Sequence, residues 1–369
     1  MRIMLVVNEF PPEKIAGTAM ATQALAEHLA VRGHQVLVVV TTSCPKHVRN
    51  QIIAKDYTLI WLKPRPFRGL GWLWRFWQTW SAGKRFSPQI IQGQAVSCGL
   101  IAAVVGRLLH VPSLCYAQGY DVYQATWLQQ KTEIRWGCAW PNQLLAVTDD
   151  LAASIQRVVD VPNVIILPHA FEFPEEKKTR QEIRQQYGLQ ASATLVLSVG
   201  RLETFKGHDV LLLAWQHILL KKPSAKLWIA GIGGQLESLQ KLVVRLGIQD
   251  SVTFLGYLSK DGVHQVMQAS DLFVLPSRSE PFGIVLLEAM AHGLPVVASD
   301  VGGIPEVLPK QGDALLVPAD DAEALTNAML KSIDRELLEG SVVNREHAMA
   351  FEWRNQVKRF ESIYLNMIE

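Results

Sequence analysis

Two glutamates, Glu280 and Glu288, lie eight positions apart in a segment whose pattern predicts a strand, a loop and a helix. An apolar strand over Leu272–Leu275 precedes them, and an apolar helix over residues 284–291 carries Glu288. Gly283 lets a ligand approach the backbone, and the unpaired amides of a helix start favour an anion such as phosphate. One acid beside a reacting group and one acid that grips a ribose would suit a bound sugar nucleotide.

A second strand, loop and helix pattern carries two cations, Arg201 and Lys206, with Gly200 and Gly207 beside them. Arginine offers a planar fork of donors and lysine a point charge, so the two together suit a diphosphate. A solvated basic loop is the alternative, since exposed Arg and Lys are the rule. The Glu280 segment in the same chain favours a binding site.

The composition indicates a globular protein of two domains. The chain has 369 residues, of which 49% are hydrophobic and 19% charged. A net charge of +2 gives no argument for a nucleic-acid partner. The N-terminus turns polar too soon for a signal peptide, and no apolar stretch reaches the ~20 residues of a spanning helix, so we expect a cytoplasmic protein. The cysteines show no metal or redox spacing, and we expect each to be a small, reduced core residue: Cys44, Cys98, Cys115 and Cys138.

Strands and helices alternate along both halves of the chain, which predicts two doubly wound parallel sheets. The first half begins with a strand over Ile3–Val7, and the second half restarts the alternation with a strand over Thr194–Val199. A charged segment between the halves is interpreted as a linker. Ligands of such sheets bind beyond the carboxyl ends of the strands, so we expect Arg201, Lys206 and Glu280 on one face.

The motifs of the second half resemble those of the retaining glycosyltransferases of family four, the glycosyl transferases group 1. The matching stretches are Ser198–Leu202, Lys206–Gly207, Ile229–Gly231, Phe254–Gly256, Ala269–Leu272, Glu280–Gly283, Glu288–Ala298 and Gly302–Glu306. The first half fits more loosely, through Pro11 and Pro12, Gly17, Gly33, His34 and Thr148. The resemblance covers nearly the whole chain. It implies an α/β protein of the GT-B fold, with two facing Rossmann-like doubly wound sheets and a cleft between them.

The resemblance also implies a domain layout. An N-terminal acceptor domain is expected over residues 1–168 and a linker over 169–190. A donor-binding domain is expected over 191–350, and a helix over 351–369 would return to the N-domain.

The same resemblance assigns roles to matching residues. Arg201, Lys206 and Glu280 form the expected catalytic group: the two cations would bind the donor diphosphate and stabilise the departing nucleotide, and the acid would lie beside the donor sugar. The other expected donor-binding residues are Phe282, Gly283 and Ile284 at the sugar, Glu288 at the ribose, Leu258 at the base and Gly17 at the diphosphate.

Three positions would bear on the acceptor or on the donor sugar. Asp121 follows Gly119 as in the Gly-x-Asp turn of the family. Gln118 stands where the family commonly has histidine, and a glutamine cannot act as an acid or a base. His169 and its neighbours replace a common Asn-Gly pair at a position that lines the cleft. These changes leave the acceptor, whether glycan, lipid-linked compound or small molecule, less defined than the nucleotide-sugar donor.

The resemblance implies a front-face mechanism, in which the leaving diphosphate helps to deprotonate the acceptor and the protein supplies position and electrostatics. The chain has no Asp-x-Asp motif, so we expect no obligatory metal and no cofactor. Two other functions stay open: a sugar-nucleotide 2-epimerase of the same architecture, and a catalytically inactive sugar-nucleotide binder.

Residues 61–85 contain five of the eleven tryptophans, surrounded by lysines and arginines. Aromatic residues mixed with cations are typical of a helix at a membrane interface, which predicts peripheral contact with an anionic inner leaflet. A core helix is the alternative, since Leu73, Trp77 and Trp80 share a face at helical spacing.

Overall fold

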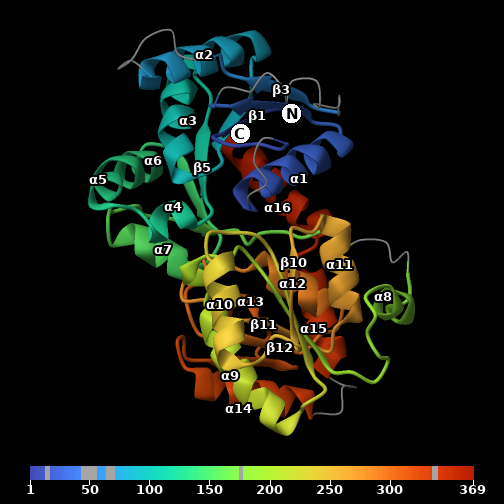
Figure 1. Ribbon diagram of the computed structural model, residues 1–369. Helices are drawn as coiled ribbons and strands as arrows, with labels where there is room; N and C mark the ends of the chain where they lie inside the picture. The colour runs from blue at the N-terminus through green and yellow to red at the C-terminus, as the bar shows by residue number, and fades with distance from the viewer. Residues whose placement is uncertain (13–16, 43–55, 64–70, 174–177, 335–339) are drawn as a thin grey trace. The chain divides into compact units, whose positions relative to one another are not determined.

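A computed structural model describes residues 1–12, 17–42, 56–63, 71–173, 178–334 and 340–369. The chain forms two compact units (Figure 1): unit 1 is Met1–Ala170 with Trp353–Glu369, and unit 2 is Phe171–Glu352. Each unit holds its own parallel sheet with helices on both faces, so the two doubly wound sheets predicted from the sequence are confirmed.

Unit 1 has a seven-stranded sheet in the order β3-β2-β1-β4-β5-β6-β7. Its strands are β1 (Arg2–Val7), β2 (Gln35–Val40), β3 (Thr58–Trp61), β4 (Ile90–Gly93), β5 (Ser113–Ala117), β6 (Gln143–Ala146) and β7 (Ile165–Ile166). Its helices are α1 (Gly17–Val31), α2 (Gly71–Phe86), α3 (Val96–Leu109), α4 (Tyr120–Tyr123), α5 (Trp127–Gln129), the π-helical turn η2 (Gln130–Ile134), α6 (Arg135–Ala139), α7 (Asp149–Gln156) and α16 (Trp353–Ile368).

The central strands of unit 1 are apolar along almost their whole length because helices cover both faces of the sheet. Helices α2 and α3 pack on one face, where Met4 and Val6 of β1 meet Ile101 and Ala102 of α3. Helices α1 and α16 contact each other, and α16 reaches β4 through Tyr364, whose hydroxyl donates to Gln92 Oε1 at 2.5 Å.

Unit 2 has a six-stranded sheet in the order β10-β9-β8-β11-β12-β13. Its strands are β8 (Leu195–Val199), β9 (Lys226–Ala230), β10 (Val252–Gly256), β11 (Leu272–Leu275), β12 (Val296–Ser299) and β13 (Ala314–Val317). Its helices are α8 (Arg180–Gln186), the 3-10 turn η3 (Thr204–Lys206), α9 (His208–Lys221), α10 (Leu236–Leu246), α11 (Lys260–Ala269), α12 (Ile284–Ala291), α13 (Ile304–Val307), α14 (Ala322–Ile333) and α15 (Gly340–Met349).

Each sheet reverses its strand order once. In unit 1 the chain runs outward from β1 through β2 to β3 and then returns to the other side of β1 with β4. In unit 2 it runs from β8 through β9 to β10 and returns beside β8 with β11. Such a switch point opens a crevice at the carboxyl ends of the two central strands, where ligands of this architecture bind.

The structure bears out the core-helix interpretation of residues 61–85 in part, since α2 packs against the core of unit 1, and corrects which residues face that core. Helix α2 forms as expected, but Leu73 and Trp77 are 54% and 51% exposed. The face of α2 that packs on the sheet carries Trp80, as expected, together with Phe76, and Ala82 of the same helix is part of the buried core. The segment also includes residues 64–70, and these, like Cys44, lie outside the described residues. Among the helices that the structure describes, none combines the length and the apolar character needed to cross a membrane.

Candidate active site

The switch point of unit 2 brings together two of the residues predicted to be catalytic. Lys206 closes the turn that follows β8, and Glu280 lies in the loop that follows β11. Lys206 Nζ donates to Glu280 Oε2, and the two side chains are only 10% and 7% exposed. A buried charge is costly unless it is paired, so this ion pair holds both groups at the carboxyl edge of the sheet.

The two loops that carry this pair are fixed to each other by backbone contacts. Gly207 has φ 67°, and a Cβ there would lie 1.9 Å from the carbonyl oxygen of Pro276. The amide of Arg278 donates to the carbonyl oxygen of Phe205 at 2.8 Å. Only glycine permits so close an approach at Gly207, so the sequence sets the distance between the loops.

Arg201 is the exposed member of the predicted catalytic group. Its guanidinium lies over the ring of Phe205, 5.1 Å from the centroid, and Lys206 Nζ lies 5.9 Å from the same centroid. Phe205 therefore holds both cations near one ring.

Arg278 was not singled out from the sequence, yet it organises this edge of the sheet. Its guanidinium donates to both carboxylate oxygens of Asp209, at 2.8 and 2.7 Å, and to Asp320 at 2.6 Å. Its hydrogen bonds to Asp209 are the largest cause that raises the pKa of Arg278. Because the guanidinium of Arg278 is paired with these two acids, we interpret Arg278 as a residue that fixes the loop. Arg201 and Lys206 are then the cations that we assign to the ligand.

His208 follows Gly207 at the start of α9 and is 3% exposed. Burial, and then the charge of Lys206, lower its pKa to about 4, so the ring is neutral at pH 7. Its Nδ1 has no hydrogen-bond partner within the described structure.

Helix α12 presents the remaining acid of the unit 2 site. Gly283 caps its start with φ 86°, and Ile284 is its first residue, directly after the buried Phe282. Glu288 lies one turn further along and is half-buried. Burial raises its pKa to about 7, against the opposing charge of Lys260.

Leu258, predicted to lie at the base, follows β10 at the edge of the same sheet. It is partly exposed and lies beside Gly262, where an added Cβ would be 3.3 Å from the Cβ of Leu258. Unit 2 therefore brings every predicted donor-binding residue except Gly17 to the carboxyl ends of its strands.

In unit 1 the predicted residue Gln118 has a partner that the sequence did not suggest. Gln118 Nε2 donates to Gln94 Oε1 at 2.9 Å, and the residues are 6% and 1% exposed. Gln94 Nε2 and Gln118 Oε1 have no partner within the described structure. An amide pair joined by one bond retains one nitrogen and one oxygen whichever way each amide is turned, so the pair keeps hydrogen-bonding capacity for a ligand or a water.

The other predicted residues of unit 1 are Asp121, His169 and Gly17, and each has its own surroundings. Asp121 Oδ2 accepts from the amide of Val96, at 2.8 Å, and so holds the start of α3. His169 is buried and forms a T-shaped contact with Tyr116, at a centroid distance of 5.7 Å, and burial lowers its pKa to about 3. Gly17 begins α1, and nothing lies within 4 Å of a Cβ built there.

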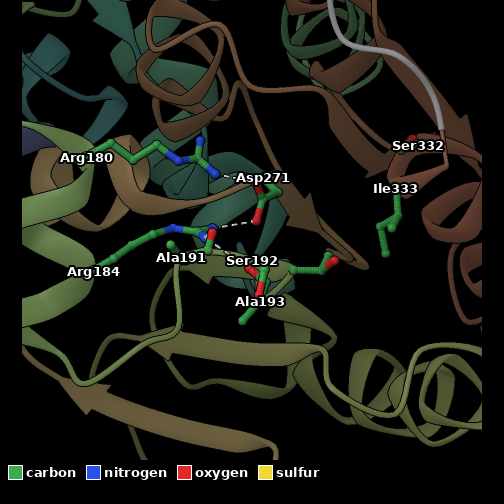
Figure 2. A pocket seen from close by; sticks show the side chains of 9 residues that line it. Arg180, Arg184, Ala191, Ser192, Ala193, Asp271, Ser332 and Ile333 are labelled. Atoms are coloured by element: carbon green, nitrogen blue, oxygen red, sulfur yellow. Dashed lines mark hydrogen bonds and ion pairs between the residues drawn. The ribbon is translucent and has the colours of Figure 1, made fainter.

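Unit 2 also has a hollow away from these residues (Figure 2). It has a volume of about 150 Å³ and lies at the amino ends of β8 and β11, opposite the predicted site. The guanidinium of Arg184 donates there to Asp271, at 2.6 Å. It also donates to the carbonyl oxygens of Ala191, Ala193 and Ala269. With its donors used in this way, Arg184 joins α8 to the sheet, and we assign the hollow a structural role.

Both halves of the chain match known family models. Residues 179–349 match the model described as glycosyl transferases group 1. Residues 15–172 match the model described as glycosyltransferase family 4.

Individual relatives agree with these matches. An uncharacterized glycosyltransferase of Methanocaldococcus jannaschii is 26% identical over 99% of this chain and 98% of its own length. Mannosylfructose-phosphate synthase of Agrobacterium fabrum is 37% identical, over 46% of this chain and 38% of its own. Among solved structures, HepE of Anabaena in complex with UDP-glucose superposes with a TM-score of 0.83 at 18% identity, covering 99% of this chain and all of that one.

Proposed function

The chain belongs to the glycosyltransferases of family 4, group 1, and we propose that it moves a sugar from a nucleoside-diphosphate sugar to an acceptor hydroxyl with retention of the anomeric configuration. The observation that carries this proposal is the buried Lys206–Glu280 pair, with Arg201 beside it, at the switch point of unit 2.

The charges of these residues suit the departure of a diphosphate. Without a donor, Glu280 neutralises Lys206, which makes a buried ammonium tolerable. When a diphosphate is bound, Lys206 and Arg201 would share their charge with its oxygens. The site would then stabilise negative charge that grows as the bond to the sugar breaks, with little reorganisation of the protein.

The proposed transfer is a single exchange at the anomeric carbon. The bond from that carbon to the phosphate oxygen breaks, and a bond to the acceptor oxygen forms on the same face of the sugar. The proton of the acceptor hydroxyl passes to the leaving phosphate oxygen. Glu280 would stabilise the positive charge that develops on the sugar, and no side chain need act as a nucleophile.

The donor would occupy the residues that follow β8, β10 and β11. Glu288 would accept from the ribose hydroxyls, Leu258 would pack on the base, and the start of α12 would face the sugar and phosphates. UDP-glucose is the first donor to test, because HepE, whose structure was solved with UDP-glucose, shares this fold. We also propose that the two cations suffice for the leaving group without a divalent ion, so a chelator should leave the rate unchanged.

The acceptor would be a glycan, a lipid-linked compound or a small molecule. The Gln94–Gln118 pair, Asp121 and His169 are the residues of unit 1 that we propose for the acceptor or sugar side. The exposed face of α2 favours an acceptor near a membrane.

Thermal unfolding with UDP, GDP, ADP and their glucose derivatives tests the donor site, since a ligand that binds only the folded chain raises the melting temperature by mass action. We expect one base to give a clear shift that Lys206→Met abolishes. Lys241→Met is the matched control, because Lys241 pairs with Glu237 in the same unit while both are more than 70% exposed. No shift with any nucleotide would overturn the proposal.

A further inference from the structure

Unit 1 exposes a group of large aromatic side chains. Five of the eleven tryptophans are between 38% and 68% exposed, and they lie on α2, α5 or α6 or directly after α6: Trp72, Trp77, Trp127, Trp136 and Trp140. Leu73 and Leu128, next to Trp72 and Trp127 in the chain, and Leu108 near the end of α3 are each more than half exposed. Tryptophan is normally buried for most of its surface, so a concentration of exposed ones indicates a binding surface.

The end of α3 connects the two helical regions that carry these tryptophans. On one side, a Cβ at Gly83 of α2 would lie 2.8 Å from Leu109 Cδ1. On the other side, Arg107 donates to the carbonyl oxygen of Trp140 at 2.7 Å and lies over its ring, 5.3 Å from the centroid. Leu108, between these residues, points to solvent. We call α2, the end of α3, and residues 127–140 together the aromatic face.

The charges on the aromatic face are mostly positive. Helix α2 contains three basic residues, Arg75, Lys84 and Arg85, and no acid. Arg107 and Arg135 add exposed cations, whereas residues 127–140 contain a single acid, Glu133. Long cationic side chains beside tryptophans match a bilayer interface, where rings lie at the headgroup level and cations meet anionic lipid. Protein interfaces also favour tryptophan and arginine but are depleted of lysine, whereas α2 carries Lys84 over the ring of Trp80.

We propose that the aromatic face docks unit 1 on an anionic lipid membrane. Helix α2 would be the first membrane-contacting region and residues 127–140 the second. The second membrane-contacting region lies outside the tryptophan-rich segment 61–85. If the proposed transfer activity holds, the acceptor hydroxyl would be carried by, or lie next to, that membrane.

Sedimentation with vesicles tests the docking. The full chain is mixed at low salt with vesicles of phosphatidylcholine alone, or of phosphatidylcholine with phosphatidylglycerol. We expect it to sediment with the anionic vesicles and to be released as salt rises, because salt screens the cations. Trp72→Ser/Trp77→Ser and Trp127→Ser/Trp136→Ser should each weaken binding at least about tenfold, since each removes two interfacial rings.

Leu220→Ser/Val244→Ser is the matched control. These residues are 79% and 68% exposed on unit 2, so the pair removes exposed apolar surface elsewhere and should leave sedimentation unchanged. No sedimentation of the wild type with anionic vesicles would overturn the proposal. If only the Trp72/Trp77 variant loses vesicle binding, residues 127–140 are not a membrane-contacting region. Concentration-dependent self-association that the tryptophan variants abolish would assign the face to a second copy of the chain.

Nucleotide stabilisation of the same variants separates this proposal from the proposed function. The exposed substitutions should leave the shift with nucleotide unchanged. A chain that binds nucleotide but not vesicles would retain the transferase assignment and lose only the membrane docking.

Discussion

Lys206 Nζ donates to Glu280 Oε2 although the two residues are 74 positions apart in the chain. The parallel pairing of β8 and β11 brings them together, because each residue follows the carboxyl end of one of these strands. The pair is therefore a product of topology as well as of composition.

Because the two side chains form one pair, single and double substitutions should affect the free energy of unfolding and the turnover rate differently. Lys206→Ala leaves Glu280 buried without its partner, which should cost about 3–5 kcal/mol of unfolding free energy. Removing both, in Lys206→Ala/Glu280→Ala, should recover most of that loss while turnover stays at least ~100-fold below wild type, since transition-state charge is no longer stabilised. Denaturant unfolding and single-turnover rates measure the two effects. Recovery of turnover in the double variant would contradict the catalytic assignment.

Glu288 predicts a pH dependence of stability. Its pKa is raised to about 7 in the folded chain, so it stays protonated where the unfolded chain has already ionised. Glu288 therefore contributes most to the free energy of unfolding below about pH 4.5, where it is protonated in both states. This contribution is lost as the pH rises to about 7. Relative to Glu288→Gln, the wild type should lose up to about 3 kcal/mol across this range. Parallel slopes for the two proteins would contradict the raised pKa.

The same carboxyl predicts a pH dependence of donor binding. Ribose hydroxyls donate to the ionised carboxylate, so nucleotide affinity should rise as pH rises through about 7 and should fall below it by up to about tenfold per pH unit. Titration calorimetry between pH 5.5 and 8.5 measures this. Glu288→Gln should bind more weakly at pH 8 with a flat profile, and an unchanged slope in that variant would assign the dependence to another group.

The amide pair of unit 1 predicts opposite effects on stability and activity. Gln94→Leu/Gln118→Leu removes two buried atoms without partners, which should leave stability unchanged or raise it by about 1–2 kcal/mol. Turnover should fall, since the free amide atoms would no longer meet a substrate hydroxyl. Gln92→Leu, two positions earlier in β4, is the control, because Gln92 accepts from Tyr364 and its loss should lower stability instead. Full activity in the double variant would limit the pair to a structural role.

Gly207 predicts a local backbone requirement. Gly207→Ala would combine a left-handed backbone with a contact of 1.9 Å to the Pro276 carbonyl, so the two site loops would have to separate. Gly247→Ala has nearly the same φ, 69°, but nothing within 4 Å of the added carbon, and should cost only about 1–2 kcal/mol. The Gly207 variant should lose more stability than this and most of its nucleotide binding. Equal effects on both measurements would remove Gly207 from the site.

The alternation of apolar strands and helices was enough to predict both sheets, since buried parallel strands read as continuous apolar runs such as those around Val38 and Val274. The strands β3 (Thr58–Trp61) and β7 (Ile165–Ile166) were missed because they are short edge strands with weak apolar signals. Leu73 and Trp77 were assigned to the wrong face of α2, because spacing alone fixes which residues share a face but not which face packs on the sheet.

The predicted unit 2 residues gather at one edge of a sheet because strand ends can be read from the sequence. Gln94 and Arg278 could not be found in this way. Nothing in the sequence marks Gln94 as a site residue. Only the register of β4 and β5 brings it to Gln118. Arg278 resembles any loop arginine until Asp209 and Asp320 are seen beside it.

Helix α16 belongs to unit 1 but is synthesised last. Tyr364 and Phe360 are at most 1% exposed in unit 1, yet the ribosome makes them after the whole of unit 2. During synthesis, the part of the N-terminal sheet around Gln92 therefore lacks its α16 cover until residues 353–369 have been made. A chaperone that binds the nascent chain would find its binding surface on the half that is made first.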